Sequence, residues 1–177
     1  MQADEFAVAL VHAPVLNRQG VSSATAITPM DVHDFARTAA FYGVRRVFMV
    51  HPAEAMHQMV DDLTGYWQTG EGGVRNRGRK EVLQSIEMLH NLEEAQEMGY
   101  QLWFTSANPP EGAVRKPSEL PSMAGKHLLV FGTAWGLDDK HLPKANGWLS
   151  PIDGIGKVRH LSVRAALAIY LDRLCMS

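Results

Sequence analysis

The chain lacks several features that would narrow its class at once. It has a single cysteine, Cys175, so no internal disulfide can form, which predicts a reducing compartment. No uncharged apolar run approaches the length of a membrane span, and the first residues lack the pattern of a signal peptide. A formal net charge of −2 provides no global positive field, so any basic surface must be local. We therefore expect a cytoplasmic protein with no membrane partner.

Familiar catalytic and binding motifs are also missing. The chain has no G-x-G-x-x-G after its first apolar run, no G-x-x-x-x-G-K-[ST] and no G-x-S-x-G, which excludes the usual dinucleotide, P-loop and nucleophile-elbow sites. Its eight histidines are scattered, and none forms H-E-x-x-H or a Cys/His cluster. Asp31, His33 and Asp34 share one helical turn, but Asp31 is better explained as a helix cap. We expect no metal site.

What is present has the pattern of a globular α/β protein. The 177 residues, 46% hydrophobic and 20% charged, suit a single domain over 1–177. Strand-like apolar runs alternate with helical patterns, which predicts a mostly parallel sheet with helices on both faces. The expected strands cover 6–13, 44–51, 86–91, 100–107, 127–134 and 147–152. Helices are expected at 29–43, 80–85 and 92–99. Two more helices are expected to begin at 52 and 161, and a short helical piece is expected around 138–145.

The clearest local signal marks the start of the helix expected at 29–43. Thr28 can act as its N-cap, Pro29 takes the first helical position, and Asp31 sits at the capping-box position. Gly43 supplies the stop. These residues predict the ends of one helix with unusual clarity.

Three of the expected strands end in segments rich in small residues, glycine or proline. The sequences "TSANPP", "GTAWGL" and "SPIDGIG" follow the strands expected at 100–107, 127–134 and 147–152. In parallel sheets, ligands bind outside the carboxyl ends of the strands, and small residues let the main chain approach a ligand closely. The three segments together predict a pocket built largely from main chain.

These segments belong to a wider resemblance. The chain resembles the SPOUT superfamily of RNA methyltransferases, most closely the small stand-alone S-adenosylmethionine-dependent members, over nearly its whole length. The resemblance is carried by "LVHAPVLNRQG", "TAITPMDVHDFARTAAFYGV", "GEGGVRNRGRKE", "LLVFGTAWGL" and "HLSVRAALAIYLDRL". The related tRNA ribose 2′-O-methyltransferases have three motifs. The arginine of the first falls on Arg37, the second resembles 132–137, and the third keeps the spacing of Pro151, Gly154 and Ser162.

The chain departs from those ribose methyltransferases at three points. Asp31 stands where they have asparagine, the second motif is one residue shorter and lacks its glutamate, and His160 replaces the asparagine of the third. The resemblance therefore implies S-adenosylmethionine as cofactor and tRNA or rRNA as substrate, with either a ribose 2′-oxygen or a base nitrogen as the methylated atom.

The resemblance also implies a SPOUT fold with a C-terminal trefoil knot, a homodimer formed through the knot region, and a set of site residues. By motif position Arg37 is the first catalytic candidate, either binding the target phosphate or helping to deprotonate the nucleophile. If the target is a ring nitrogen, Asp31 or Asp34 becomes the expected proton acceptor, with Asp31 the second catalytic candidate. The expected cofactor-binding residues are Thr105, Ser106, Phe131, Gly132, Thr133, Gly136, Leu137, Ser150, Pro151, Ile152, Gly154, His160, Leu161 and Ser162.

A basic, glycine-rich connection is expected at 68–80. Its cations form a local positive patch that either contacts RNA phosphates or simply remains solvated, and Arg45 and Arg46 are candidates to extend it. The expected RNA-binding residues are Arg75, Arg77, Arg79 and Lys80.

Two other functions remain open from the sequence. The altered second motif favours an RNA-binding or assembly factor that keeps the SPOUT fold without turnover. A flavodoxin-like protein that binds flavin or another small molecule is a third reading.

Overall fold

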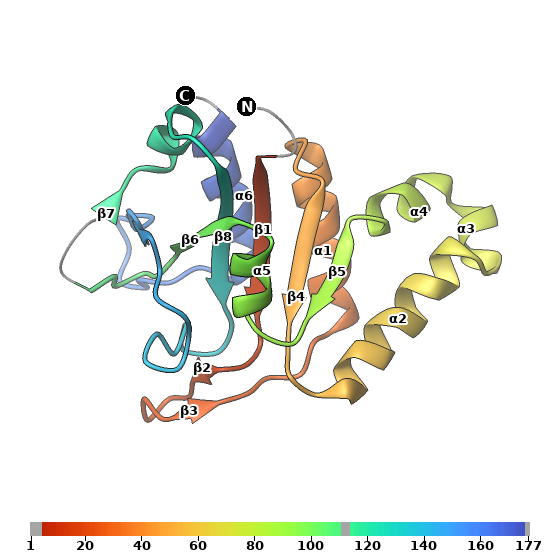
Figure 1. The fold of residues 1–177 in the computed structure, drawn as a ribbon, viewed down its shortest axis with the longest axis horizontal. Coiled ribbons are helices and arrows are strands. Elements are labelled where there is room, and N and C mark those ends of the chain that lie inside the picture. Colours follow the sequence, from red (N-terminus) through yellow and green to blue (C-terminus); the bar gives the residue numbers. More distant parts are fainter. Residues whose placement is uncertain (1–4, 111–113, 176–177) are drawn as a thin grey trace.

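A computed structural model describes residues 5–110 and 114–175, so both ends of the expected 1–177 domain lie outside the description (Figure 1). Seven strands form one sheet in the order β5-β4-β1-β8-β6-β9-β7, and all neighbours pair in parallel. Its strands are β1 (Phe6–Val11), β4 (Arg46–Val50), β5 (Ile86–Leu89), β6 (Tyr100–Phe104), β7 (Val114–Arg115), β8 (Lys126–Gly132) and β9 (Gly147–Leu149).

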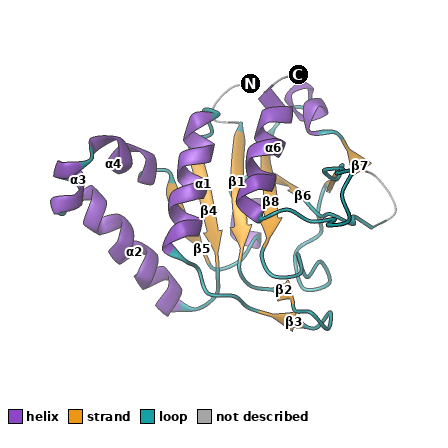
Figure 2. Ribbon diagram, turned by 180° about the vertical axis from the view of Figure 1, so that it is seen from behind, coloured by secondary structure: helices purple, strands orange, loops and turns teal. Residues whose placement is uncertain are grey.

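A small antiparallel hairpin and the helices complete the fold. The hairpin lies beyond the carboxyl end of β1, between that strand and the first helix (Figure 1). Figure 2 shows α1 (Pro29–Phe41) and α6 (Val163–Cys175) lying over one side of the sheet. The elements are β2 (Val15–Leu16), β3 (Ser22–Ser23), α1 (Pro29–Phe41), α2 (Glu54–Gln68), α3 (Glu71–Arg75), α4 (Arg77–Leu83), α5 (Glu93–Glu97), a 3-10 helix (Pro117–Ser122) and α6 (Val163–Cys175).

The central strand β1 is buried on both faces because helices or loops cover each side of the sheet. Phe6, Val8 and Leu10 point into a core shared with α1 and α6, which buries Phe35 and Leu167. The alternate residues of β1 are Ala7, Ala9 and Val11, and they point into a second core under α5 and the loop that follows β8. An uninterrupted apolar run is what a strand buried on both faces requires, so the expected α/β architecture is confirmed.

The start of α1 agrees with its sequence signal. The Asp31 backbone N–H donates to Thr28 Oγ1 at 3.2 Å, and the Thr28 N–H donates to Asp31 Oδ2 at 3.0 Å. Both bonds satisfy donors that the first helical turn leaves free. The helix ends at Phe41, two residues before Gly43, whose φ of 76° is the left-handed conformation that glycine adopts most readily.

The expected loop at 68–80 is wrong, because this segment forms α3 and α4. Asn76 lies between the two helices and accepts a hydrogen bond from the Arg79 N–H at 3.0 Å, which caps α4. Gly73 fits because it has no side chain: a Cβ there would lie 2.2 Å from the Trp67 carbonyl oxygen. The glycines therefore permit close helix packing rather than a loop. We call residues 54–83 the α2–α4 arm, which projects beside the sheet (Figure 2).

Other boundaries also differ from expectation. The helical piece around 138–145 is absent, because the chain turns at Asp138, whose carbonyl accepts from the His141 N–H at 3.0 Å, and Pro143 follows. The strand expected at 147–152 is shorter than predicted: β9 ends at Leu149, before Pro151. Within the described residues, no helix has the length and apolar character needed to cross a membrane.

Candidate cofactor pocket

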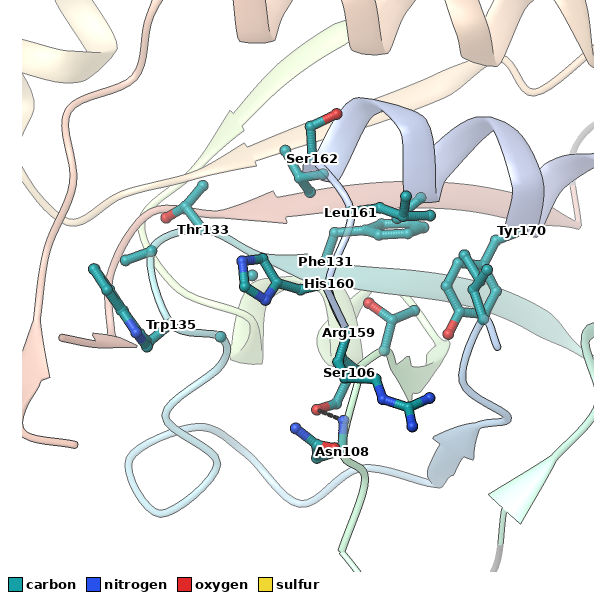
Figure 3. Close-up of a pocket in the computed structure, with 18 residues that line it drawn as sticks. Ser106, Asn108, Phe131, Thr133, Trp135, Arg159, His160, Leu161, Ser162 and Tyr170 are labelled. Carbon is teal, nitrogen blue, oxygen red and sulfur yellow. Dashed lines mark hydrogen bonds between the residues drawn. The ribbon is translucent and has the colours of Figure 1, made fainter. Parts of the chain in front are cut away.

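A cavity of about 590 Å³ opens beyond the carboxyl ends of β6 and β8, against the start of α6 (Figure 3). Its volume lies in the range of small-molecule sites. The segments after the two strands form part of the wall, and the chain leading into α6 forms another part. Most of the expected cofactor-binding residues line it: Thr105, Ser106, Phe131, Gly132, Thr133, Gly136, Ile152, His160, Leu161 and Ser162.

The structure places the other four expected residues outside the lining. Leu137 is 6% exposed and packs in the core beneath the loop. The other three are Ser150, Pro151 and Gly154, whose main-chain carbonyls accept hydrogen bonds that hold the segment before α6 in place. The Ser150 carbonyl accepts from Tyr170 Oη at 3.0 Å, that of Pro151 from Arg173 at 3.4 Å, and that of Gly154 from Arg159 at 3.5 Å.

Sequence reasoning missed several lining residues. Val163, Ala166 and Tyr170 line the cavity from α6 at spacings of three and four, so they share one helix face. That periodicity was a usable signal, because Ser162 already marked the start of the helix. Asn108 lies in the predicted pocket segment 105–110 although it was not singled out, whereas Arg159 carries no comparable signal, since it lines the cavity from the loop before α6.

The loop after β8 approaches itself so closely that only glycine fits at its start. A Cβ on Gly132 would lie 2.7 Å from the Leu137 backbone nitrogen and 2.9 Å from the Gly136 carbonyl carbon. The Gly136 N–H donates to the Thr133 carbonyl at 2.9 Å, which closes the turn. Bonds to the β2–β3 hairpin hold the same loop: Leu16 N–H donates to the Gly136 carbonyl at 2.9 Å. One wall of the cavity is therefore rigid main chain.

A partly buried hydrogen-bond chain runs from this wall toward α1. Thr133 Oγ1 lies 2.6 Å from Thr25 Oγ1, which lies 2.9 Å from His12 Nδ1. His12 is 1% exposed, and its Nε2 lies 4.0 Å from Asp31 Oδ2 with no hydrogen-bond partner among the described residues. Burial lowers the pKa of His12 to about 4, although the Asp31 carboxylate opposes the shift. His12 is therefore neutral at pH 7.

Neither catalytic candidate lines the cavity. Asp31 serves as the helix cap described above, and Arg37 is exposed on α1. Arg37 instead lies in a positive region: its cation and that of Arg79 both lower the pKa of His33, after burial, which is the largest cause. An ion pair between Arg164 and Asp34 at 3.3 Å joins α1 to the first turn of α6 beside the cavity.

The expected RNA-binding cations lie on the α2–α4 arm. Arg79 stacks over the Trp67 ring at 4.5 Å, and its helix packs on α1. Arg75 forms an exposed ion pair with Glu71 at 3.4 Å, while Arg77 and Lys80 line a shallow hollow of the arm. Arg46 does not extend the patch, because its guanidinium binds Glu87 in two places on the neighbouring strand.

The fold and cavity define an α/β protein with a ligand site at the carboxyl edge of a parallel sheet. The described residues contain no group of three histidine, cysteine or acidic side chains arranged for a metal ion. The sequence profile of the family described as "SAM-dependent RNA methyltransferase" matches residues 5–176. The chain therefore belongs to this S-adenosylmethionine-dependent family.

Two relatives have similar sequences over most of the chain. An uncharacterised protein of Aquifex aeolicus is 33% identical, over 94% of this chain and 86% of its own length. A protein of Nitratidesulfovibrio vulgaris named tRNA (guanine-N(1)-)-methyltransferase is also 33% identical, over 94% of this chain. The match spans only 41% of that longer protein, so its name does not say which part carries the activity.

Solved structures of SPOUT methyltransferases share the fold. TrmJ from Z. mobilis superimposes with a TM-score of 0.66 at 16% identity, covering 97% of this chain and 68% of its own. The TrmH/SpoU tRNA-modifying enzyme of A. aeolicus gives a TM-score of 0.60 at 17% identity, covering 98% of this chain and 75% of its own. At these identities the likeness establishes the fold, and the chemistry must be argued from the site.

Proposed function

We propose that this protein transfers a methyl group from S-adenosylmethionine to tRNA or rRNA, with a ribose 2′-oxygen or a base nitrogen as the acceptor. The observation that supports it most directly is the cavity wall at 132–136, where Gly132 allows main-chain atoms to pack closely outside the carboxyl end of β8. A member of an S-adenosylmethionine-dependent family with a cavity of about 590 Å³ at this edge has the room and the polar main chain for that cofactor.

The proposed roles follow from position in the cavity. The main chain of 132–136, the hydroxyls of Thr133 and Ser162 and the apolar side chains of Phe131 and Leu161 would hold the cofactor. Bound there, it supplies a methyl group activated by a positively charged sulfur. The chain's contribution is to orient the donor and keep water away, and correct orientation is worth up to about 7–11 kcal/mol of barrier.

For the RNA, the exposed Arg37 fits the role of a phosphate-binding residue better than that of a base, because guanidinium groups stay charged. Asp31 keeps its proposed role as proton acceptor for a ring nitrogen, although Oδ2 is already engaged by Thr28.

We also propose a cytoplasmic homodimer that associates through the C-terminal region and has the trefoil knot of its superfamily. Support comes from α6, which leaves Ala165, Ala168 and Ile169 partly exposed while Leu167 and Leu171 are buried in the core. A partly exposed apolar stripe on a C-terminal helix is suited to pack against a second copy.

Calorimetry with S-adenosylmethionine, followed by methyl incorporation into deproteinised RNA, tests the proposal. Binding and incorporation support the enzyme. Binding without incorporation into any RNA species favours the assembly factor, and affinity for flavin in place of S-adenosylmethionine favours the flavodoxin-like reading. Mass spectrometry of nucleosides from cells lacking the protein then identifies the methylated atom.

The proposed RNA surface is tested by reversing Arg77 and Arg79 to glutamate. We expect weaker binding to total tRNA and a salt dependence whose slope falls by about one unit for each phosphate that is no longer neutralised. Binding is measured by filter retention across a series of salt concentrations. Reversing Lys126 and Lys144, which lie near the starts of β8 and β9, changes the net charge equally and should leave the slope unchanged. Equal effects of the two double variants would remove the arm from the RNA surface.

A further inference from the structure

The side chain of Trp135 is exposed at the edge of the cofactor cavity. It is 65% exposed although it belongs to the cavity lining, whereas Trp103 in the core is 2% exposed. Figure 3 shows its ring at the mouth, on the same side as Thr133 and with His160 nearby. Tryptophan is the side chain with the largest apolar area to gain by burial, so a fixed, exposed tryptophan beside a ligand site requires an explanation.

The backbone that presents Trp135 is strained and tightly held. Ala134 has φ of 51°, and among the described residues it is the one non-glycine with positive φ. This conformation is unfavourable for a residue with a Cβ, and such strain persists only where the surroundings enforce it, often at ligand sites. Here the Trp135 N–H donates to the Leu16 carbonyl at 3.0 Å, and the turn closes through Gly136 and Thr133. The surrounding bonds therefore enforce a strained turn that points an indole outward.

The surroundings of Trp135 match the chemistry of unstacked RNA. The hairpin that holds its backbone continues to Arg18, an exposed cation two residues beyond Leu16. Proteins hold an extruded base on a flat aromatic face and its phosphate with a cation. Here the aromatic face is on the loop after β8, and the cation is on the hairpin bonded to that loop. Bases in a duplex are already stacked and cannot use such a platform.

We propose that Trp135 stacks on the target nucleobase, or on its immediate neighbour in a single-stranded part of the substrate RNA, and holds it at the mouth of the donor cavity. This inference rests on the proposed function. It assigns Trp135 to the RNA rather than to the methyl donor, because the indole is 65% exposed at the edge of the cavity. Ala134 acts as a positioning residue by fixing the direction of the indole.

Binding of a mixed-sequence, single-stranded RNA oligonucleotide tests the proposal, in the presence of saturating S-adenosylhomocysteine. Trp135→Ala should weaken binding by about 5- to 150-fold, the range measured for loss of one base–aromatic stack. Trp135→Phe keeps a stacking face, so it should retain most of the affinity but lose the quenching of protein fluorescence by RNA. Phe41, at the far end of α1, is an aromatic residue even more exposed than Trp135, so Phe41→Ala is the matched control and should bind as the wild type does.

Three results would overturn the inference. The first is Trp135→Ala binding the single strand as tightly as wild type. The second is wild type showing no preference for the single strand over the matching duplex. The third is an equal loss of S-adenosylhomocysteine affinity in Trp135→Ala, measured by calorimetry, which would assign the indole to the donor. Failure of the proposed function is distinguishable, because then the wild-type protein itself binds no S-adenosylhomocysteine.

Discussion

Replacing Gly132 by alanine is expected to lower the affinity for S-adenosylmethionine by about 5- to 150-fold. The added Cβ would lie 2.7 Å from the Leu137 backbone nitrogen and 2.9 Å from the Gly136 carbonyl carbon, so backbone must move. Forcing a methyl group into a packed site costs about 1–3 kcal/mol, and here the part that moves is the cavity wall itself. Calorimetry measures the affinity, and thermal unfolding measures how much of the cost falls on the fold.

Gly65→Ala is the matched control for this change. Gly65 lies within α2, and a Cβ there meets nothing within 4 Å. Alanine in a helix interior is favoured over glycine by about 0.5–1 kcal/mol, so this variant should be slightly more stable and bind the cofactor normally. If Gly132→Ala bound as tightly as Gly65→Ala, the loop after β8 would not be part of the cofactor site.

The second large effect is a pH dependence of stability that arises from His12. Burial depresses the pKa of His12 from 6.5 to about 4, so between these values the unfolded chain binds a proton that the folded chain rejects. His12 therefore favours the folded state above pH 6.5, and this contribution is lost as the pH falls through about 4. The loss amounts to about 3 kcal/mol, from 1.36 kcal/mol per pKa unit.

The measurement is urea unfolding of wild type and His12→Asn at pH values from 7 to about 4. Asparagine keeps a donor near the position of Nδ1 for Thr25 but does not titrate. The free energy of unfolding of wild type should fall relative to that of the variant as the pH is lowered through the window set by the two pKa values. A constant difference between the two proteins would mean that folding does not lower the pKa of His12.

His90→Gln supplies a comparison of opposite sign. His90 lies 3.0 Å from Glu54, and this hydrogen bond raises the pKa of its imidazole. Its stabilising contribution is therefore present below the unfolded pKa and is lost as the pH rises through the folded pKa. His90→Gln should therefore lower the free energy of unfolding at low pH. His12→Asn has the opposite effect there, because it removes the cost of protonating a buried imidazole.

Features set by neighbours in the sequence were predictable. The capping box at Thr28 and Asp31 depends on residues three apart, and it forms as expected. The gathering of 105–106 and 131–136 in one cavity also followed from the sequence, because the carboxyl ends of parallel strands share one edge of the sheet. Both arguments use only local pattern and a general property of parallel sheets.

Features set by tertiary contacts were not predictable. Consecutive glycines such as Gly72 and Gly73 are typical of a loop. They lie in a helix because the rings of Tyr66 and Trp67 and the Trp67 carbonyl of α2 leave no room for a Cβ there. Arg46 is a cation next to Arg45, so the sequence made it a candidate for binding phosphate. Only the pairing of Val47 with Ile86 in the sheet brings Glu87 beside it. Arg37 shows the same limit, since its motif position did not reveal that it lies outside the cavity lining.

The bond between Thr25 and Thr133 joins residues 108 positions apart in the chain. Contacts of such high sequence separation form slowly, because a long loop must close before they stabilise anything. Until β8 has been synthesised, β1 has an open hydrogen-bonding edge on the side that β8 will occupy. The cofactor wall is therefore completed late in folding, and a nascent chain that stalls before residue 126 exposes an apolar strand edge prone to aggregation.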